Sequence, residues 1–490
     1  MGKKNATRKN NNKYKPTVCD NKMSFQECEL AILRQAVDES EELAGKKLAG
    51  NDDIKDMIRI VEDFISKKKL ICYGGTAINN LLPKHARFYN YEYEVPDYDF
   101  YSSDAFKDAK ELADVYFAAG YTDVEAKSGV HEGTYKVFVN FIPMADVTQM
   151  QQDLFKSVSN SSVSIGGIKY APPNFLRMGM YLELSRPAGD TSRWEKVLKR
   201  LTLLNKYRPM KVDYDCENID FQRKMAQSAD DSERLYFTVR DTFIDIGVVF
   251  FGGYASSIYS RHMSKKDKLL AQKIPDFDVI TEDPEKCATI VIERLHDEGF
   301  KKVKQIKHDA IGEIIPEHIE IQYENEILGF IYKPIACHNY NTITVGESEI
   351  NVATIDTIMS FYLAFLYIDN NYYYHDRTLC MAKYLFDLQG KNKLAQRGVL
   401  KRFGSECIGV QETMESIRAK KASKFAELRG KKESEEYEKF FLKYTPSDKD
   451  KKKNNDSKTK KATQTKKKSK KTSTEKKPNM LKSFGIKPLF

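Results

Sequence analysis

The sequence predicts an α+β fold in which two similar units, each roughly 150 residues long, follow one another in tandem. An apolar segment ending in two glycines occurs twice, at residues 73–76 (Tyr-Gly-Gly-Thr) and 251–254 (Phe-Gly-Gly-Tyr). An Asp-x-Asp follows each copy, in residues 96–99 and 275–278. The second glycine precedes the first aspartate by 22 residues in one copy and 23 in the other. Repetition at such a spacing indicates duplicated structure.

The first unit is preceded by helical signals. Ser24 followed by Glu27 is a capping box, which predicts a helix through about residue 43. Asp52 or Asp53 can begin a second helix, which places one apolar face at Ile54, Met57, Ile58, Val61 and Ile65. Residues 70–73 then predict a buried strand, and the glycine pair leads into a helix over 77–82.

The second copy repeats this order. A helix is expected around 233–245, a strand over 247–251 and, after the glycines, a helix through Ile258. Both copies continue with a helix that ends at a glycine, Gly120 or Gly299. They then have β-rich segments, at 134–147 and 317–337, in which 138–147 is expected to be one apolar strand. Each closes with a strand-to-helix step, at 168–176 and 350–359.

These patterns divide the chain into six segments. They are a basic disordered tail (1–16), an N-terminal helical segment (17–54), a first α+β domain (55–210), a second α+β domain (211–400), a charged helical segment (401–445) and a Lys-rich disordered tail (446–490).

The net charge of +10 is concentrated in the two tails. Residues 446–490 hold 16 Lys against 4 acids, and residues 1–16 hold six bases and no acid, which leaves the body between them at −8. Such tails favour two interpretations: capture of a polyanion by counterion release, or a solubilising or localisation segment.

Several classes of protein are disfavoured. No apolar run approaches the roughly 18 to 20 residues of a membrane helix, and the first residues have no signal-peptide core. We therefore expect no membrane partner. The eight cysteines are scattered, without a Cys-x-x-Cys pair, and are expected to be reduced thiols.

The Asp-x-Asp of the first unit predicts a metal site. Asp97 and Asp99, two residues apart on a strand, point to the same face and can converge on a metal pair held roughly 4 Å apart. Asp146, an acid in an otherwise apolar strand, is the candidate third ligand, because burying it alone would be costly.

The glycine pair predicts a phosphate site. Without Cβ atoms, Gly74 and Gly75 let the backbone approach phosphate oxygens, and the following helix directs its free N–H groups at them. Thr76 can add a hydroxyl donor. Gly-Gly or Asp-x-Asp alone is weak evidence, but their duplicated combination with a later strand acid is strong.

The second unit lacks this set of acids. Aligning residues 143–146 (Pro-Met-Ala-Asp) with 334–337 (Pro-Ile-Ala-Cys) puts Cys337 in place of Asp146, while Asp276 and Asp278 are kept. Thiolate is a poor ligand for Mg²⁺. The second unit is therefore predicted to be catalytically silent.

Other candidate residues have two interpretations each. Arg193, Lys196 and Lys199 lie three to four residues apart and either contact a triphosphate or RNA backbone or form a solvated helix face. Trp194 is more typical of a core residue than of a base-stacking platform, and for the aromatics at 372–374 helix packing is favoured over stacking with RNA bases.

Taken together, these motifs resemble the nucleotidyltransferase fold of the polymerase-beta type. More narrowly, they resemble the poly(A) polymerases of large cytoplasmic DNA viruses, namely the poxvirus catalytic subunit and its giant-virus, Mimivirus-type, relatives. Residues 184–187 (Leu-Ser-Arg-Pro), Asp190 and residues 192–201 also resemble that group, and the resemblance covers about residues 55–400. Gly75-Thr76 replaces the commoner Gly-Ser, and the Lys-rich tail matches nothing in the family pattern.

The resemblance implies an active first and a degenerate second nucleotidyltransferase unit. Gly74, Gly75 and Thr76 would contact the phosphates of ATP, and Asp97, Asp99 and Asp146 would bind two Mg²⁺ ions, with Mn²⁺ as the alternative. The implied reaction is template-independent addition of AMP to an RNA 3′ end.

The resemblance leaves the partnership open, because the poxvirus enzyme pairs with a separate processivity subunit whereas the giant-virus type acts as a homodimer. The basic tails, which would let this protein hold RNA unaided, favour a homodimer. The implied setting is the host cytoplasm, in a viral factory or packaged in the virion.

Two alternatives remain open at this point. Another template-independent nucleotidyltransferase on this scaffold, such as a uridylyl, CCA-adding or oligoadenylate-forming enzyme, would share these motifs. A non-catalytic RNA-binding processivity subunit is the alternative from a different class, although the intact acid set of the first unit argues against it.

Overall fold

A computed structural model of the chain describes residues 18–19, 23–49, 52–90, 94–216, 229–263, 276–368, 373–391 and 396–446. The chain forms two compact units, Met1–Thr445 and Pro446–Phe490, and all that follows concerns the first. Both predicted basic tails lie outside the described residues, apart from Pro446.

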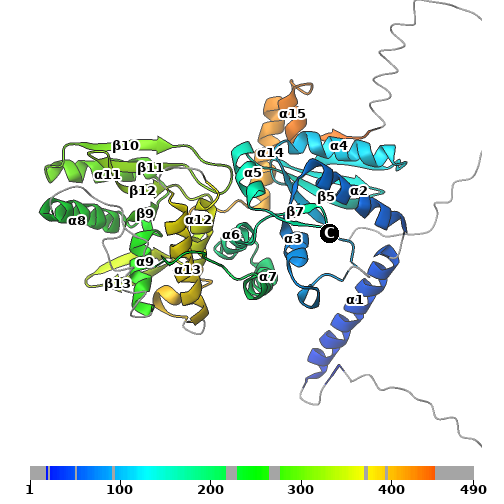
Figure 1. Cartoon of the computed structure of the whole chain (residues 1–490), viewed down its shortest axis with the longest axis horizontal. Coiled ribbons are helices and arrows are strands. Elements are labelled where there is room, and N and C mark those ends of the chain that lie inside the picture. Colours follow the sequence, from blue (N-terminus) through cyan, green and yellow to red (C-terminus); the bar gives the residue numbers. More distant parts are fainter. Residues whose placement is uncertain are drawn as a thin grey trace, which may run out of the picture. The chain divides into compact units, whose positions relative to one another are not determined.

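The first half of the chain builds a mixed sheet of eight strands (Figure 1), in the order β16-β3-β4-β5-β2-β1-β7-β6. Helices α2 and α4 pack on it, and α3, α6 and α7 pack against one another. The strands are β1 (Ile71–Cys72), β2 (Tyr98–Ser102), β3 (Val124–Ser128), β4 (Thr134–Val139), β5 (Ile142–Gln149), β6 (Val163–Ile165), β7 (Ile168–Tyr170) and β16 (Lys443–Tyr444). The helices are α1 (Phe25–Ala49), α2 (Asp52–Lys68), α3 (Gly74–Leu81), α4 (Ala105–Ala118), α5 (Gln152–Asn160), α6 (Pro173–Leu184) and α7 (Trp194–Tyr207), with short 3₁₀ turns η1 (Lys84–Ala86) and η2 (Thr191–Arg193).

The second half builds another mixed sheet of eight strands, in the order β10-β11-β12-β9-β8-β14-β13-β15. Helices α8 and α11 pack on this sheet, and α12 packs against α13. The strands are β8 (Val249–Phe250), β9 (Phe277–Ile280), β10 (Val303–His308), β11 (His318–Tyr323), β12 (Glu326–Tyr332), β13 (His338–Val345), β14 (Ser348–Ala353) and β15 (Cys407–Ile408). The helices are α8 (Ala229–Ile246), α9 (Gly253–Tyr259), α11 (Pro284–Asp297), α12 (Ile355–Phe365), α13 (His375–Lys391), α14 (Met414–Leu428) and α15 (Glu435–Phe440), with 3₁₀ turns η4 (Ser260–His262) and η5 (Gly398–Leu400).

The two sheets share one order of strands and one set of pairing directions. The series β3-β4-β5-β2-β1-β7-β6 corresponds strand by strand to β10-β11-β12-β9-β8-β14-β13. In both, the glycine-pair strand is antiparallel to the Asp-x-Asp strand and parallel to a later strand, β7 or β14. In both, the Asp-x-Asp strand is parallel to the second strand of a hairpin, β5 or β12.

Two predicted helices are confirmed at the start of the chain. In α1 the backbone N–H of Ser24 donates to Glu27 Oε2 at 2.7 Å and the N–H of Glu27 donates to Ser24 Oγ at 3.3 Å, which is the expected capping box. In α2 the predicted apolar face is buried, except that Ile58 is half-buried.

The predicted single strand over residues 138–147 is wrong, because the chain reverses inside it. Asn140 and Phe141 take φ values of 50° and 66°, and this two-residue turn joins β4 to β5. A turn with two positive φ angles matches the twist of a tight hairpin. The second half does the same at Glu324 and Asn325, with φ values of 50° and 75°.

Helix α6 of the first half packs against α12 of the second, which joins the two halves through their cores. Every residue of α12 is buried, consistent with a helix covered on all sides. At the end of α6 the carbonyl of Ser185 accepts a hydrogen bond from the backbone N–H of Asn339 at 2.8 Å. The Tyr181 hydroxyl is 3.1 Å from Gln389.

The charged segment after residue 400 contains helices α14 and α15, and it also adds a strand to each sheet. β15 pairs with β13, and β16 pairs with β3 at the edge of the first sheet. Lys110 of α4 bonds Glu438 at 2.6 Å, and the Tyr444 hydroxyl donates to Asp114 at 2.5 Å. The chain therefore returns to its first sheet after completing the second.

The prediction of reduced cysteines is wrong for six of the eight residues. Disulfides join Cys19 to Cys28, Cys216 to Cys380 and Cys337 to Cys407, whereas Cys72 and Cys287 are free and buried. Their sequence separations reach 164 residues, so spacing along the chain carries no sign of the pairing. Among the described helices, none is long and apolar enough to cross a membrane.

A buried ion pair is expected to dominate the stability of α12. Arg402 donates from Nε to Asp356 Oδ2 at 2.8 Å and from Nη2 to Oδ1 at 2.5 Å, and Asp356 is fully buried. Asp356→Asn leaves the guanidinium without its counter-charge and should cost about 3–5 kcal/mol in chemical denaturation. Asp387→Asn, which breaks the more exposed pair with Lys383, should cost less than about 1 kcal/mol. Equal costs for the two variants would contradict this assignment.

Candidate active site

The sheet register brings the three predicted acids together. β2 and β5 are parallel neighbours, and Asp99 lies opposite Asp146. Asp97 is the residue immediately before β2, two positions from Asp99. Because alternate residues of a strand share one face, Asp97 and Asp99 lie on the same side as Asp146. The charges of Asp97 and Asp146 both raise the pKa of Asp99, which shows how close the three carboxylates lie.

Burial and mutual repulsion raise the pKa of two of these acids. Burial, followed by the charges of Asp97 and Asp146, raises the pKa of Asp99 from 3.8 to about 7. The pKa of Asp97 is also raised, by burial and then by Asp146. Lys136 opposes both shifts, and its ammonium group bonds Asp146 Oδ2. The site therefore holds more negative charge than its neighbours neutralise.

The glycine pair is required by the acids and by the loop beside it. Gly74 has φ of +69°, and a Cβ there would be 2.3 Å from Asp99 Oδ2. A Cβ on Gly75 would be 2.3 Å from the hydroxyl oxygen of Tyr89. The pair forms the first turn of α3, whose N-cap residue Tyr73 makes no side-chain capping bond. The open N–H groups of that turn suit an anion.

Thr76 contacts the backbone of Asp97, and the phosphate contact predicted for it stays a prediction. Its hydroxyl donates to the backbone carbonyl of Asp97 at 2.7 Å, and the residue is 1% exposed. In the second half the backbone N–H of Tyr254 makes the corresponding bond to the carbonyl of Asp276, at 3.0 Å. Thr76 thus positions the Asp97 loop against α3.

The donor set of this site fits a divalent cation. Asp146 Oδ1 is buried and accepts no hydrogen bond from the described residues. Carboxylate oxygens are the ligands that Mg²⁺ prefers, and a cation there would relieve the repulsion that raises the pKa of Asp99. Within the described residues, no group of three or more His, Cys, Asp or Glu side chains is arranged to hold a metal ion as it stands. Metal binding by Asp97, Asp99 and Asp146 stays a prediction.

Arg200 is a site residue that the sequence analysis missed. Both its terminal nitrogens would be 3.1 Å from a Cβ on Gly75, and Nη2 donates to the Tyr89 hydroxyl at 2.9 Å. Its guanidinium also stacks on the ring of Phe88, 4.9 Å from the centroid. Arg200 therefore faces the first turn of α3, and its charge acts on Asp99.

The three predicted basic residues separate in the structure. Lys196 faces Arg200, whose charge is the main cause of the lowered pKa of Lys196. Arg193 lies 3.3 Å from Glu183. Lys199 is exposed and bonds Glu195 at 2.5 Å. The spacing of four from Lys196 to Arg200 was the available signal, since such pairs share a helix face.

Of the aromatics predicted to pack, Trp194 and Tyr373 are half-buried against other side chains, whereas Tyr374 is not. Trp194 donates from its ring nitrogen to the carbonyl of Glu183 at 3.0 Å and contacts Phe403. Tyr373 stacks on Phe365 and shares a hydrogen bond with the Tyr332 hydroxyl. Tyr374 is exposed, and residue 372 lies outside the described residues.

The corresponding place in the second half has no third acid. Asp278 lies opposite Phe330 of β12, at the position where Asp99 faces Asp146. Cys337 lies beyond β12 and is disulfide-bonded, so the alignment that put it at this place is wrong, although the absence of an acid there is confirmed. Arg377 of α13 forms an ion pair with Asp276, which is 6% exposed.

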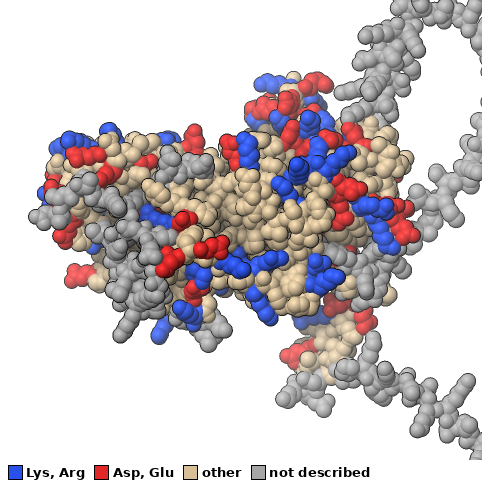
Figure 2. Space-filling model, in the orientation of Figure 1, with Lys and Arg blue, Asp and Glu red and all other residues tan. Residues whose placement is uncertain are grey.

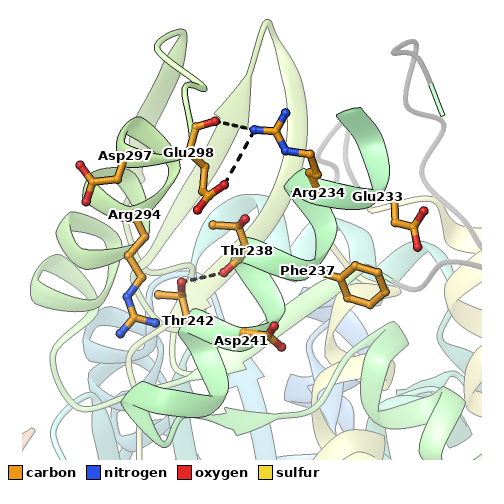
Figure 3. A pocket seen from close by; sticks show the side chains of 9 residues that line it. All are labelled: Glu233, Arg234, Phe237, Thr238, Asp241, Thr242, Arg294, Asp297 and Glu298. Atoms are coloured by element: carbon orange, nitrogen blue, oxygen red, sulfur yellow. Dashed lines mark hydrogen bonds and ion pairs between the residues drawn. The ribbon is translucent and has the colours of Figure 1, made fainter. Parts of the chain in front are cut away.

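One hollow lies in the second half, away from both Asp-x-Asp strands. It has a volume of about 690 Å³, and Figure 3 shows its side chains on α8 and at the end of α11. Both of its arginines have acidic partners: Arg234 lies 3.8 Å from a carboxylate oxygen of Glu298, and Arg294 lies 2.6 Å from one of Asp245. Four acids line it beside these two arginines, so its described lining carries a net negative charge.

Comparisons with known proteins identify relatives of the part that carries the acids. Residues 59–190 match the family model described as "Poly(A) polymerase catalytic subunit". A protein of African swine fever virus (strain Badajoz 1971 Vero-adapted), named "Putative poly(A) polymerase catalytic subunit", is 32% identical over 176 residues, which are 35% of this chain and 37% of the relative. A protein of the same name from Acanthamoeba polyphaga mimivirus is 29% identical over 223 residues, or 43% of this chain and 36% of that protein.

The fold of most of the chain matches a solved structure. The crystal structure of the Megavirus polyadenylate synthase superposes with a TM-score of 0.72 at 20% identity, covering 90% of this chain and 92% of that one. The expected resemblance to viral poly(A) polymerase catalytic subunits is confirmed. The aligned sequence spans little more than a third of the two viral relatives.

The raised pKa of Asp99 predicts how stability depends on pH when divalent metal is removed. A carboxyl whose pKa is higher in the folded state stabilises the fold below about pH 4, and this contribution is lost as the pH rises through about 7. Thermal unfolding in chelator should therefore show stability falling over that range, and Asp99→Asn should reduce the fall. Asp153→Asn, at an exposed position, is the control and should leave the slope unchanged. A slope unaltered by Asp99→Asn would overturn the assignment.

Proposed function

We propose that the chain is a template-independent poly(A) polymerase that adds AMP from ATP to the 3′ end of RNA and releases pyrophosphate. The main support is the set of three carboxylates on β2 and β5 beside the open first turn of α3. That arrangement places a site for cations next to a site for phosphates. The family match over residues 59–190 includes all of these residues, which favours adenylyl transfer over other chemistry.

In the proposed reaction the 3′ oxygen of the RNA forms a bond to the α-phosphorus of ATP while the bond from that phosphorus to the bridging oxygen breaks. Asp97, Asp99 and Asp146 would hold two Mg²⁺ ions, or Mn²⁺, which supply charge stabilisation and lower the pKa of the attacking hydroxyl. The backbone N–H groups of Gly74 and Gly75 and the guanidinium of Arg200 bind and orient the triphosphate. Lys196 adds positive charge beside Arg200.

We also propose that the two halves arose by duplication and that only the first is catalytic. Their shared strand order and pairing directions support the duplication. Two observations support a second half without catalytic activity. Phe330 lies where Asp146 lies in the first half, and the charge of Arg377 already neutralises Asp276. A cation bound there would have to displace a buried guanidinium.

The expected partners and setting follow from the same reaction. ATP and an RNA 3′ end are its substrates, and the chain is proposed to act as a homodimer in the host cytoplasm or viral factory. Light scattering at working concentration tests the dimer, and a monomer there would remove it from the proposal.

Primer extension tests the function. An RNA oligonucleotide is incubated with each nucleoside triphosphate in turn and with Mg²⁺ or Mn²⁺, without template. The wild type should form long products from ATP alone. Asp146→Asn should reduce extension below about 1% of wild type, because the site loses a carboxylate. The matched control Asp278→Asn should retain activity.

Each of the other outcomes would favour a different function or a different active site. Extension from UTP or CTP would indicate a different nucleotidyltransferase, and no extension by the wild type would favour a non-catalytic RNA-binding subunit. Loss of activity in Asp278→Asn alone would place the active site in the second half.

Arg200→Met tests the triphosphate contact. Removing a guanidinium that donates to phosphate should lower kcat/KM for ATP by about 10- to 100-fold. Lys199→Met, on the same helix but paired with Glu195, should change it by less than about threefold. Steady-state kinetics with varied ATP distinguishes them, and equal effects would show that Arg200 acts only through the net charge of α7.

A further inference from the structure

A second hollow of about 720 Å³ lies where helices of the two halves meet. It is lined by the first turn of α6, the residues that follow α7, the end of α12 and the start of α13, with two serines from the α5 region. Its charged lining residues are Arg177, Arg208 and Lys211, joined by His375, and no Asp or Glu is among the described residues that line it. We call these four residues and the hollow they line the basic pocket.

Arg177 is the buried member of the basic pocket, with 1% of its surface exposed. Its described partners are neutral: Nη1 donates to Asn174 Oδ1 at 2.7 Å, Nε to Asn205 Oδ1 at 2.8 Å and Nη2 to the Leu204 carbonyl at 3.5 Å. Burial lowers its pKa to about 10. A buried cation with only neutral partners is costly, and a bound anion would compensate that cost.

Two further cations of the pocket are exposed and have no acidic partner among the described residues. Arg208 donates from Nε to the carbonyl of Leu81 at 3.0 Å, which fixes its stem against the end of α3. Lys211 makes no ion pair with a described residue. His375 lies 3.3 Å from Asp376, so it is the one member of the pocket that already has an acidic neighbour.

The charge balance distinguishes this pocket from the hollow in Figure 3. There, four acids accompany two arginines, and both arginines are engaged. In the basic pocket the cations outnumber the acids, and the N-terminal residues of α6, from Pro172 to Asn174, add the positive end of a helix. Figure 2 shows Lys and Arg side chains gathered over the part of this face where α7 lies in Figure 1.

We propose that the basic pocket binds a phosphate group, supplied by a phosphodiester of the RNA strand upstream of its 3′ end. This proposal rests on the proposed function for its source of phosphate. α7 links the two sites: Arg200 faces the first turn of α3, and Arg208 reaches its last turn. Eight residues of helix span on the order of 12 Å. A few stacked nucleotides cover that length at about 3.4 Å each.

RNA binding measured without ATP or divalent metal tests the pocket separately from catalysis. The probe is a fluorescent oligoadenylate read by anisotropy over a range of salt concentrations. Arg208→Gln with Lys211→Gln should weaken binding about tenfold. The logarithm of the association constant falls as the logarithm of the salt concentration rises. The variant should make this slope less steep by about 0.7 for each phosphate that the two side chains no longer neutralise. Both residues are exposed, so the fold should persist, which circular dichroism checks.

The matched control is Arg234→Gln with Arg294→Gln in the hollow of Figure 3. It removes the same charge, and because both arginines have acidic partners it should change RNA affinity by less than about twofold. Unchanged affinity and slope in Arg208→Gln with Lys211→Gln would overturn the proposal, whatever the wild type does with ATP. Equally weakened binding in both double variants would overturn it too, by showing a general charge effect.

A second arm separates the sources of phosphate. Inorganic phosphate should raise the Tm of the wild type and not that of Arg208→Gln with Lys211→Gln. If the wild type binds no RNA but shows this shift, the pocket binds free phosphate and the RNA source is wrong. If it shows neither, the pocket is not a phosphate site. Failure of ATP incorporation with intact RNA binding would instead count against the proposed function alone.

Discussion

The parallel register of β2 and β5 is the constraint on which the first half depends, because it sets Asp99 beside Asp146 with Asp97 at the same edge. Three carboxylates so close repel one another, and the raised pKa of Asp99 measures that cost. Neighbouring residues offset only part of this repulsion. Gly74 leaves room for the carboxylate of Asp99, and Lys136 supplies one positive charge to Asp146. Carboxylates held this close destabilise a sheet unless a cation offsets their repulsion, and this supports the proposed site for an external cation.

In the second half the same strand arrangement surrounds its aspartates with different residues. Its strand order repeats that of the first, with Asp278 in β9 and Asp276 immediately before it. There Phe330 faces Asp278, and Arg377 pairs with Asp276. The chain itself thus neutralises one of the two carboxylates, and the residue opposite the other is not an acid. The same scaffold therefore carries three mutually repelling acids in one half and two acids, one of them already paired, in the other, which is the physical basis for proposing chemistry in the first.

The sequence predicted the features that short-range patterns encode. The glycine pairs, the Asp-x-Asp strands and the capping box at Ser24 depend on residues within a few positions of one another. The hairpin at Asn140 and Phe141 was missed because Phe is an unusual turn residue and both flanks are apolar. Cys337 was matched to Asp146 for a similar reason: without the turns, a sequence alignment could not fix the strand register. Arg200 and the disulfides arise from tertiary contacts, which spacing along the chain does not reveal.

Three largely buried arginines differ in the groups that compensate their charge. Arg377 and Arg402 lie largely inside the protein, and each faces a carboxylate, of Asp276 and Asp356. Arg177 is buried more deeply than either, yet its described partners are two amide oxygens and a carbonyl. Since neutral acceptors compensate a buried charge less well than a carboxylate does, Arg177 is the arginine of the three whose position is least explained by folding alone. It lines a hollow with two further cations that lack acidic partners among the described residues. An anion from outside the chain supplies the missing counter-charge, as a cation would at the three acids of the first sheet.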